Sequence, residues 1–239
     1  MPEDKPCAQQ VAVVSGASRG IGLAVAEQLG RLGSRVVLLS RHQAALERAA
    51  SRVTALGVEA VAQVCDVQMA EAVRKTFDEV LQRFGRVDVL VNNAGVGIFG
   101  PVHEISDADW ETTLNTNLRG AFYCSKAVIP HMIHQRSGHI INISSLAGKT
   151  GFAGGSVYCA SKFGLLGLSY SMAEDLRSHG IRVSVICPGS VLTEFSHPKS
   201  KNLQKMLRPS DVARVVALLV QQTEQSFISE VLIRPTQKP

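Results

Sequence analysis

A tyrosine and a lysine stand four residues apart in the segment GGSVYCASKFG, at Tyr158 and Lys162. On a helix, residues i and i+4 share one face, so the two side chains can point into one cleft. A phenol with an ordinary pKa near ~10 is a poor base at neutral pH, but a nearby ammonium favours the phenolate and is expected to lower that pKa. The pair therefore predicts general acid and base chemistry, with Tyr158 as the residue that gives or takes a proton.

A serine hydroxyl and a glycine-rich turn add two further kinds of chemistry. Ser145 ends the apolar segment GHIINISS, and its hydroxyl could hydrogen-bond a carbonyl oxygen on which negative charge develops. The segment SGASRGIG carries Gly16, Gly20 and Gly22. Such glycines allow a tight turn and the close approach of a diphosphate to the amino end of the next helix. Each feature alone also has an ordinary structural explanation: a half-buried tyrosine, a solvated lysine, a helix-capping serine or a plain turn.

The segments that must position these residues alternate between short β-rich runs and longer helical ones. Seven runs, most of them apolar on both faces, are expected to be strands, at residues 10–16, 34–40, 58–65, 86–95, 138–145, 180–189 and 229–235. Helical periodicity fills residues 21–33, 44–57, 69–85, 108–135, 154–180 and 210–222. Strands buried on both faces indicate a sheet covered by helices. We therefore expect residues 1–239 to form one α/β domain of the Rossmann type, with a doubly wound, mostly parallel, seven-stranded sheet and helices on both faces.

Composition narrows the class of protein. The chain has 239 residues, of which 45% are hydrophobic and 19% charged, and its net charge of +5 comes from scattered residues, so we expect no nucleic-acid partner. No apolar stretch approaches the ~20 residues of a membrane span, and MPEDKPCAQQ contains no apolar signal region. The five cysteines show no metal-ligand or disulfide spacing. We therefore expect a cytoplasmic protein with no membrane partner and no metal.

Four further motifs, together with the tyrosine and lysine, resemble the short-chain dehydrogenase/reductase family from Val11 to Pro235. They are NNAG at 92–95, LNTNLRG around Asn117, Ser145 at thirteen residues before Tyr158, and CPGSVLT at 187–193. One departure is Ser15, where the family usually has threonine. The resemblance implies an oxidoreductase that interconverts a carbonyl and a secondary alcohol by hydride transfer. The catalytic residues that it implies are Asn117, which would hold a water, and Ser145, Tyr158 and Lys162.

Cofactor preference depends on two arginines. Folds that bind NAD place a carboxylate at the end of the second strand, whereas NADP sites pair arginine with the 2′-phosphate. Here the second strand ends in Ser40 and Arg41 with no acid competing there, and Arg19 lies in the glycine turn. We therefore expect NADP(H); the alternative is that both arginines are ordinary surface residues.

The resemblance assigns the remaining cofactor contacts. It implies that Asp66 and Val67 lie at the adenine, Asn93 and Ala94 at its ribose, and Val191 and Thr193 at the nicotinamide amide. The full set of expected cofactor-binding residues is Gly16, Ser18, Arg19, Gly20, Ile21, Gly22, Ser40, Arg41, Asp66, Val67, Asn93, Ala94, Gly95, Tyr158, Lys162, Pro188, Gly189, Val191 and Thr193.

The substrate is the least determined feature of the sequence. Residues 190–208 match the segment that covers the substrate in the family, and this predicted lid carries Lys199, Lys201, Lys205 and Arg208. The chain looks most like the 3-oxoacyl-[acyl-carrier-protein] reductase branch, whose acidic carrier docks on basic residues near the cleft. Arg136 matches one docking position, but His179 stands at the second.

Two alternatives to a 3-oxoacyl thioester substrate therefore stay open. The segment SFISEVLIRPTQKP departs from the acyl-carrier branch and is closer to general reductases of ketones, aldehydes or sugars. The chain could also be a nucleotide-binding scaffold or sensor without turnover, although the intact catalytic set favours an enzyme.

The resemblance also implies a homodimer or homotetramer, in which two long helices of each subunit form a four-helix bundle. The sequence supports this contact because these helices carry more apolar side chains than one sheet face should need. The residues concerned are Ala121, Phe122, Cys124, Val128, Ile129, Met132, Leu165, Leu166, Leu168 and Met172.

Overall fold

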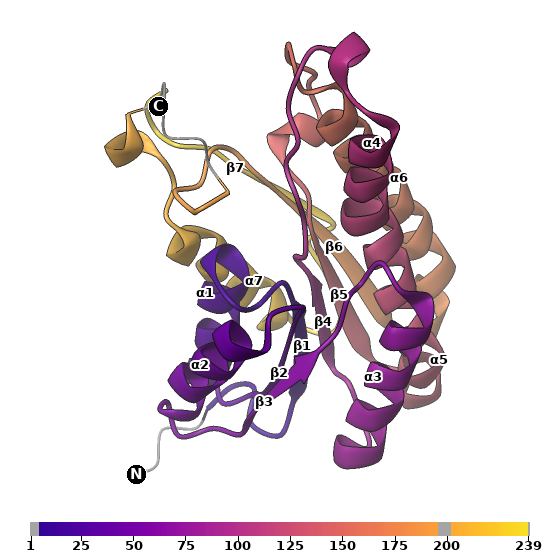
Figure 1. Ribbon diagram of the computed structural model, residues 1–239. Helices are drawn as coiled ribbons and strands as arrows, with labels where there is room; N and C mark the ends of the chain where they lie inside the picture. The colour runs from indigo at the N-terminus through magenta and orange to yellow at the C-terminus, as the bar shows by residue number, and fades with distance from the viewer. Residues whose placement is uncertain (1–4, 196–201, 239) are drawn as a thin grey trace.

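A parallel sheet of seven strands forms the middle layer of the computed structural model, which describes residues 5–195 and 202–238 (Figure 1). The strand order is β3-β2-β1-β4-β5-β6-β7, and every neighbouring pair is parallel. The strands are β1 (Val11–Ser15), β2 (Arg35–Ser40), β3 (Ala60–Val64), β4 (Val89–Asn92), β5 (Gly138–Ile143), β6 (Ile181–Pro188) and β7 (Glu230–Ile233). The predicted doubly wound Rossmann sheet is confirmed, and it is parallel throughout.

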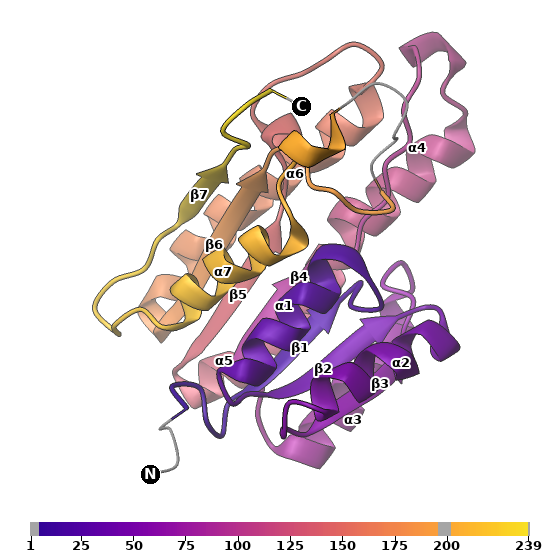
Figure 2. The same cartoon turned by 90° about the vertical axis from the view of Figure 1, so that its left-hand side faces the viewer.

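Helices cover both faces of this sheet, as Figure 2 shows for the face on which α1, α2 and α7 lie. These helices span Gly20–Arg31, Gln43–Thr54 and Pro209–Val220; the opposite face carries α3 (Ala70–Phe84), α5 (Gly120–Gln135) and α6 (Ser156–Leu176). Successive residues of a strand pack alternately against the helices on one face of the sheet and those on the other. In β1, Ala12 and Val14 pack toward α1, while Val11 and Val13 pack toward α3 and α5. This is why the strands are apolar at successive positions.

The single long helix predicted over 108–135 is interrupted. It consists of α4 (Asp107–Leu114), a π-helical turn over Asn115–Arg119, and α5. A π turn is wider than an α turn and often lies beside functional groups. Here it holds Asn117, which is fully buried.

Most of the apolar side chains from which the sequence predicts a helix-bundle dimer are used inside the protomer. The buried ones are Ala121, Cys124, Val128, Met132, Leu165, Leu166 and Met172, whereas Ile129 and Leu168 are partly buried against the core. Phe122, with 41% of its surface exposed, is the member of the set that remains open to solvent. The argument from surplus apolar surface is therefore wrong, because the sheet and its helices bury that surface. Assembly as a dimer or tetramer stays a prediction.

Three properties of the described residues bear on the class of protein. None of their helices combines the length and the apolar character that a bilayer crossing requires. No group of three or more histidine, cysteine, aspartate or glutamate side chains within residues 5–195 and 202–238 is placed to hold a metal ion. All five cysteines are free and buried.

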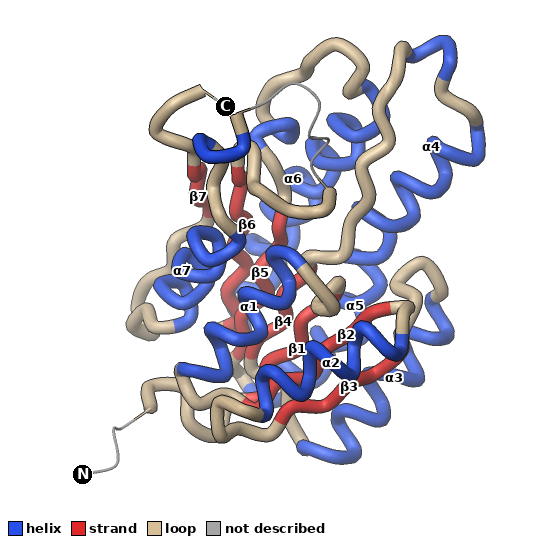
Figure 3. Tube along the Cα trace, turned by 60° about the vertical axis from the view of Figure 1, so that its left-hand side comes forward, coloured by secondary structure: helices blue, strands red, loops and turns tan. Residues whose placement is uncertain are grey.

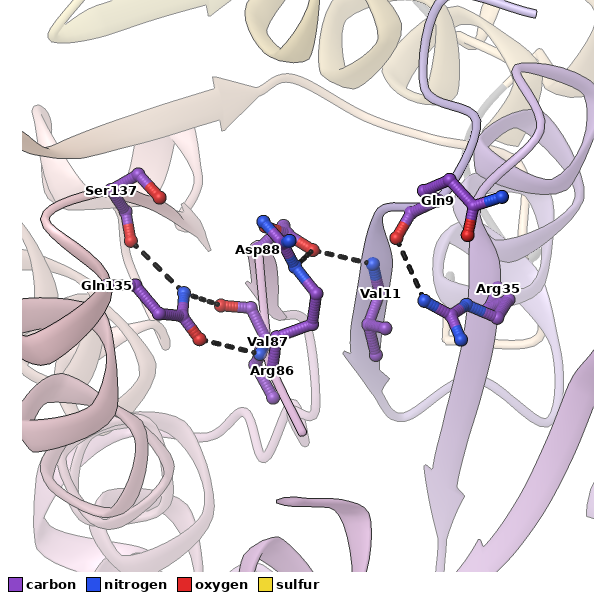
Figure 4. A network of polar contacts seen from close by, with 8 residues as sticks. All are labelled: Gln9, Val11, Arg35, Arg86, Val87, Asp88, Gln135 and Ser137. Atoms are coloured by element: carbon purple, nitrogen blue, oxygen red, sulfur yellow. Dashed lines mark hydrogen bonds and ion pairs between the residues drawn. The ribbon is translucent and has the colours of Figure 1, made fainter. Parts of the chain in front are cut away.

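A network of hydrogen bonds and ion pairs links the amino end of β1 to the residues just before β4 (Figure 4). The Asp88 carboxylate accepts from the Val11 amide of β1 at 2.8 Å and from the Arg86 guanidinium at 2.6 Å. At the end of α5, the Gln135 amide accepts from Val87 N at 3.2 Å and donates to Val87 O at 3.0 Å. The network thus joins β1, the start of β4 and α5 at the edge of the sheet.

We expect Asp88→Ala to lower the free energy of unfolding by about 1–3 kcal/mol, because the buried Val11 amide loses its acceptor. Urea denaturation measures this change. Asp78→Ala is the control: its carboxylate is 62% exposed and pairs with Arg74 at 3.6 Å, so a change within about 0.5 kcal/mol is expected. Equal losses in the two variants would show that the network adds nothing.

Candidate active site

The loops that follow the strands come together at the carboxyl edge of the sheet (Figure 3). The side chains there line a cleft of about 840 Å³. The chain winds outward in opposite directions from β1 and β4, which lie side by side. Ligands of open α/β sheets bind at such a switch point, beyond the carboxyl ends of the strands.

The glycine turn after β1 forms one end of the cleft. Gly16 and Gly20 have φ of +64° and +57°, a left-handed conformation that favours glycine. A Cβ on Gly16 would lie 2.9 Å from Ala94 Cα, and one on Gly22 would lie 2.3 Å from Gly16 O. Gly22 therefore packs beneath the turn and does not line the cleft. The N-cap of α1, Arg19, makes no side-chain cap hydrogen bond, so the helix N-terminus keeps its amides for a ligand.

Ser15 and Asn93 hold the glycine turn against the loop after β4. The Ser15 hydroxyl accepts from Asn93 N at 3.0 Å and from Ala94 N at 3.1 Å. The Asn93 amide donates to Ser15 O at 3.0 Å and to Gly16 O at 3.2 Å. Serine thus bonds the local backbone at this position, as expected for either hydroxyl residue.

The two arginines expected at the 2′-phosphate differ in their surroundings. Arg41 lies exposed at the cleft, and no ion pair to it is formed within the described part of the chain. Arg19 pairs with Glu194 from the loop after β6. An acid therefore does compete for one arginine, which the sequence did not reveal because 175 residues separate the pair. Beside them, the Ser40 hydroxyl donates to the Ser18 hydroxyl at 3.2 Å.

Tyr158 and Lys162 meet in the cleft, but their electrostatics differ from the expectation. The Ser145 side chain hydrogen-bonds the Tyr158 hydroxyl, and burial raises the pKa of Tyr158 to about 12. The predicted lowering of this pKa by Lys162 is therefore wrong for this structure. The Lys162 ammonium donates to Ile143 O at 2.9 Å and lies 5.8 Å from the centre of the Tyr158 ring. Burial lowers the pKa of Lys162 to about 8.

Asn117 lies behind the cleft and not in its wall. Its amide oxygen accepts from Val96 N at 2.7 Å, and its amide nitrogen donates to Val96 O at 2.9 Å and to Ser161 Oγ at 3.0 Å. Because these protein groups bond both ends of the amide, the side chain has a positioning role. It ties α6, one residue before Lys162, to the loop after β4.

The structure brings together the other predicted site residues. Those lining the cleft are Gly16, Ser18, Arg19, Gly20, Ile21, Ser40, Arg41, Asp66, Val67, Asn93, Ala94, Gly95, Ser145, Tyr158, Lys162, Pro188, Gly189, Val191 and Thr193. Of the predicted lid, residues 196–201 lie outside the described residues, with Lys199 and Lys201 among them. Met206 from the described part of the lid lines the cleft, and Lys205 lines a neighbouring groove of about 760 Å³.

The expected carrier-docking residues lie far from this cleft. Arg136 ends α5 just before β5, and His179 precedes β6. Both therefore lie at the amino edge of the parallel sheet, opposite the cleft. Within one protomer they cannot guide a carrier-bound thioester to Tyr158.

The cleft also contains residues that the sequence analysis missed. Phe99, Phe152 and Phe195 follow β4, β5 and β6, and they gather around Tyr158. His42, beside Arg41, and Arg234, after β7, line the cleft as well. Adjacency to Arg41 was a usable signal for His42, but nothing in the sequence connects three phenylalanines so far apart.

Comparison with known proteins agrees with this geometry. A family model described as short chain dehydrogenase matches residues 10–204. The chain is 34% identical to a sepiapterin reductase of Chlorobaculum tepidum, with 95% of this chain and 97% of that protein covered. It is 35% identical to a 3-oxoacyl-[acyl-carrier-protein] reductase of Staphylococcus epidermidis, with 87% and 90% covered.

Solved structures of related oxidoreductases also resemble this chain. A metagenomic short-chain oxidoreductase in complex with NADP superimposes with a TM-score of 0.88 at 48% identity, covering 98% of this chain and 100% of that one. An NAD⁺-bound xylitol dehydrogenase has a TM-score of 0.87 at 34% identity, covering 95% and 98%.

The buried ammonium of Lys162 gives a prediction for stability. Relative to the wild type, Lys162→Met should lose stability as pH rises from about 8 to 10.5. Folding lowers the pKa of Lys162 from 10.5 to about 8, so in this range the unfolded wild type binds more protons than the folded one. Raising pH therefore favours the folded wild type, whereas methionine has no proton to release. Guanidinium unfolding at several pH values measures the difference; a pH-independent difference would contradict the assignment.

Proposed function

The chain belongs to the short-chain dehydrogenase family, and from this premise we propose that it is an NADP(H)-dependent oxidoreductase that interconverts a carbonyl group and a secondary alcohol. One observation carries the proposal. The Tyr158 hydroxyl, hydrogen-bonded to Ser145 and close to the buried Lys162, shares one cleft with an uncapped helix N-terminus at the glycine turn.

The residues present fit a dinucleotide carrying a 2′-phosphate. The amides at the start of α1 would bind the diphosphate, since Gly16 and Gly20 place no side chains over them. Arg41 and the hydroxyls of Ser18 and Ser40 would bind the 2′-phosphate. Arg19 would join them after exchanging its partner Glu194. The related structure that contains NADP supports this choice. When bound, the nicotinamide supplies or accepts the hydride.

At the other end of the cleft, Tyr158, Ser145 and Lys162 would transfer a proton to or from the substrate oxygen. Because its pKa is about 12, Tyr158 is protonated at neutral pH and can donate to a carbonyl oxygen during reduction. Ser145 would hydrogen-bond the same oxygen as its negative charge grows. The phenolate that remains is favoured by the Lys162 charge 5.8 Å from the ring. Asn117 would hold α6 in register with the loop after β4.

The substrate class and the cellular location that the sequence predicts stay proposals. A 3-oxoacyl thioester stays a candidate substrate because relatives carry that name, although the expected docking residues lie at the opposite edge of the sheet. A cytoplasmic location is supported by five cysteines that are all free, as is usual in a reducing compartment. A non-catalytic sensor is the alternative, and it would need neither Ser145 nor Tyr158.

We expect Tyr158→Phe to lower kcat for NADPH-dependent carbonyl reduction by at least ~100-fold, because the ring stays but the transferable proton is lost. NADPH binding, followed by its fluorescence, should persist. Tyr170→Phe is the matched control: this tyrosine lies on the same helix, bonds Glu230 and Lys149, and does not line the cleft, so its rate should change less than about twofold. Retained activity in Tyr158→Phe would refute the assignment.

Arg41→Ala should raise the KM for NADPH about tenfold or more and leave that for NADH nearly unchanged, since only NADPH carries the phosphate. Arg19→Ala should have a smaller effect, because Glu194 already holds this arginine. Arg48→Ala, exposed on α2 and outside the cleft, is the control and should match the wild type with both cofactors. Equal effects of Arg41→Ala on both cofactors would mean that the arginine acts structurally.

A further inference from the structure

Three phenylalanines lie near the Tyr158 ring in the cleft and remain open to solvent. Phe99, Phe152 and Phe195 have 41%, 51% and 43% of their surface exposed, although most large apolar side chains of this chain lie in the core. All three line the cleft. Apolar surface that gathers in a cleft, and is not buried by the fold itself, marks a binding site for an apolar group.

The rings are arranged around Tyr158 itself. Phe99 meets the Tyr158 ring edge-on, with ring centres 5.3 Å apart, and Phe195 lies 5.9 Å from it. Phe152 extends the cluster beyond Phe99 at 6.0 Å. These separations are within the range in which aromatic rings attract one another. A substituent on a carbonyl that is hydrogen-bonded by Tyr158 therefore lies against this cluster, which we call the phenylalanine cluster (Phe99, Phe152 and Phe195).

The backbone is adapted to these rings. A Cβ on Gly97 would lie 2.6 Å from the Phe195 ring and 2.8 Å from the Phe99 ring. A Cβ on Gly155 would lie 2.5 Å from the Phe152 ring. At these three distances a side chain would have to displace the rings, so glycine makes room for them on the loop after β4 and just before α6. The cluster is thus part of how three separate loops pack.

The charged groups of the cleft are mostly engaged elsewhere. Arg41 and Asp66 follow β2 and β3, at the end of the cleft where the adenosine part of a dinucleotide would lie, and Arg19 is paired with Glu194. Lys162 is buried against Ile143 O. Among the described residues that line the cleft, Arg234, after β7, is a cation that a charged substrate could still meet. Beside Tyr158 the cleft combines the polar groups of Ser145 and Lys162 with the rings of Phe99 and Phe195, and this apolar surface favours an apolar substituent over a sugar or a phosphorylated one.

We propose that the substrates are ketones or aldehydes whose carbonyl group carries an aromatic ring, and that the phenylalanine cluster binds this ring beside Tyr158. The proposal rests on the proposed function, since it assigns a substrate class to the same site. It makes Phe99 and Phe152 specificity-determining residues, because their loss would weaken the contact with an aryl group more than the contact with a small alkyl group.

The test compares four carbonyl compounds with NADPH: acetophenone, cyclohexyl methyl ketone, butanone and an acetoacetyl thioester. Acetophenone and cyclohexyl methyl ketone have similar bulk, so their comparison separates aromatic stacking from size. We expect kcat/KM for acetophenone to exceed that for butanone by about tenfold or more, with cyclohexyl methyl ketone in between.

Variants of the phenylalanine cluster test whether its rings cause the preference for acetophenone over butanone. Phe99→Leu and Phe152→Leu should each reduce the ratio of kcat/KM for acetophenone to that for butanone by about fivefold, because leucine keeps apolar bulk but cannot stack. Phe122→Leu is the matched control: it is equally exposed, lies on α5 outside the cleft, and should leave the ratio unchanged. Thermal unfolding of each variant confirms that it is folded.

The outcomes separate the two proposals. Reduction of butanone or the thioester as fast as acetophenone, or ratios that the cluster variants do not alter, would overturn the aryl preference and leave the reductase function standing. Binding of NADPH without reduction of any of the four compounds would overturn both, and would favour the sensor. A preference for acetophenone that falls in the two cluster variants but not in Phe122→Leu would support the proposal.

Discussion

The burial of one parallel sheet on both faces is the constraint on which the rest of this structure depends. Parallel strands that are covered on both sides can be joined only by helical crossovers, so the loops that follow the strands meet at one edge. Residues that follow each of the seven strands line the cleft. Ser145, Tyr158 and Lys162, the glycine turn and the phenylalanine cluster therefore come together although they are distant in the chain.

The same burial sets the electrostatics of the cleft. Withdrawal from water raises the pKa of Tyr158 and lowers that of Lys162, because in both cases it disfavours the charged form. Burial therefore favours the neutral phenol of Tyr158 and the neutral amine of Lys162, whereas the spacing of the two residues suggests a charged pair. A hydrogen bond between Ser145 and Tyr158, and one from Lys162 to Ile143 O, then hold the two side chains in place.

Polar side chains that face no ligand support this arrangement from inside. Asn92 in β4 donates to Asn142 in β5 at 2.9 Å and to Ser125 in α5 at 3.1 Å, and Asn142 donates to Ser169 in α6 at 2.8 Å. These buried bonds join the sheet to the helices that carry the π turn and the tyrosine. Hydrogen bonds between buried polar groups favour one packing of the layers, because a shift would break them.

The sequence by itself determined the fold class and all seven strands, because apolar periodicity is a local property. The motifs that carry the family resemblance placed about half of the residues that line the cleft. The sequence did not determine the π turn at Asn117, the pairing of Arg19 with Glu194, or the direction in which the Tyr158 pKa shifts. It also could not reveal the phenylalanine cluster. These features depend on which groups become neighbours across the sheet and how much water they lose, and only the tertiary structure decides that.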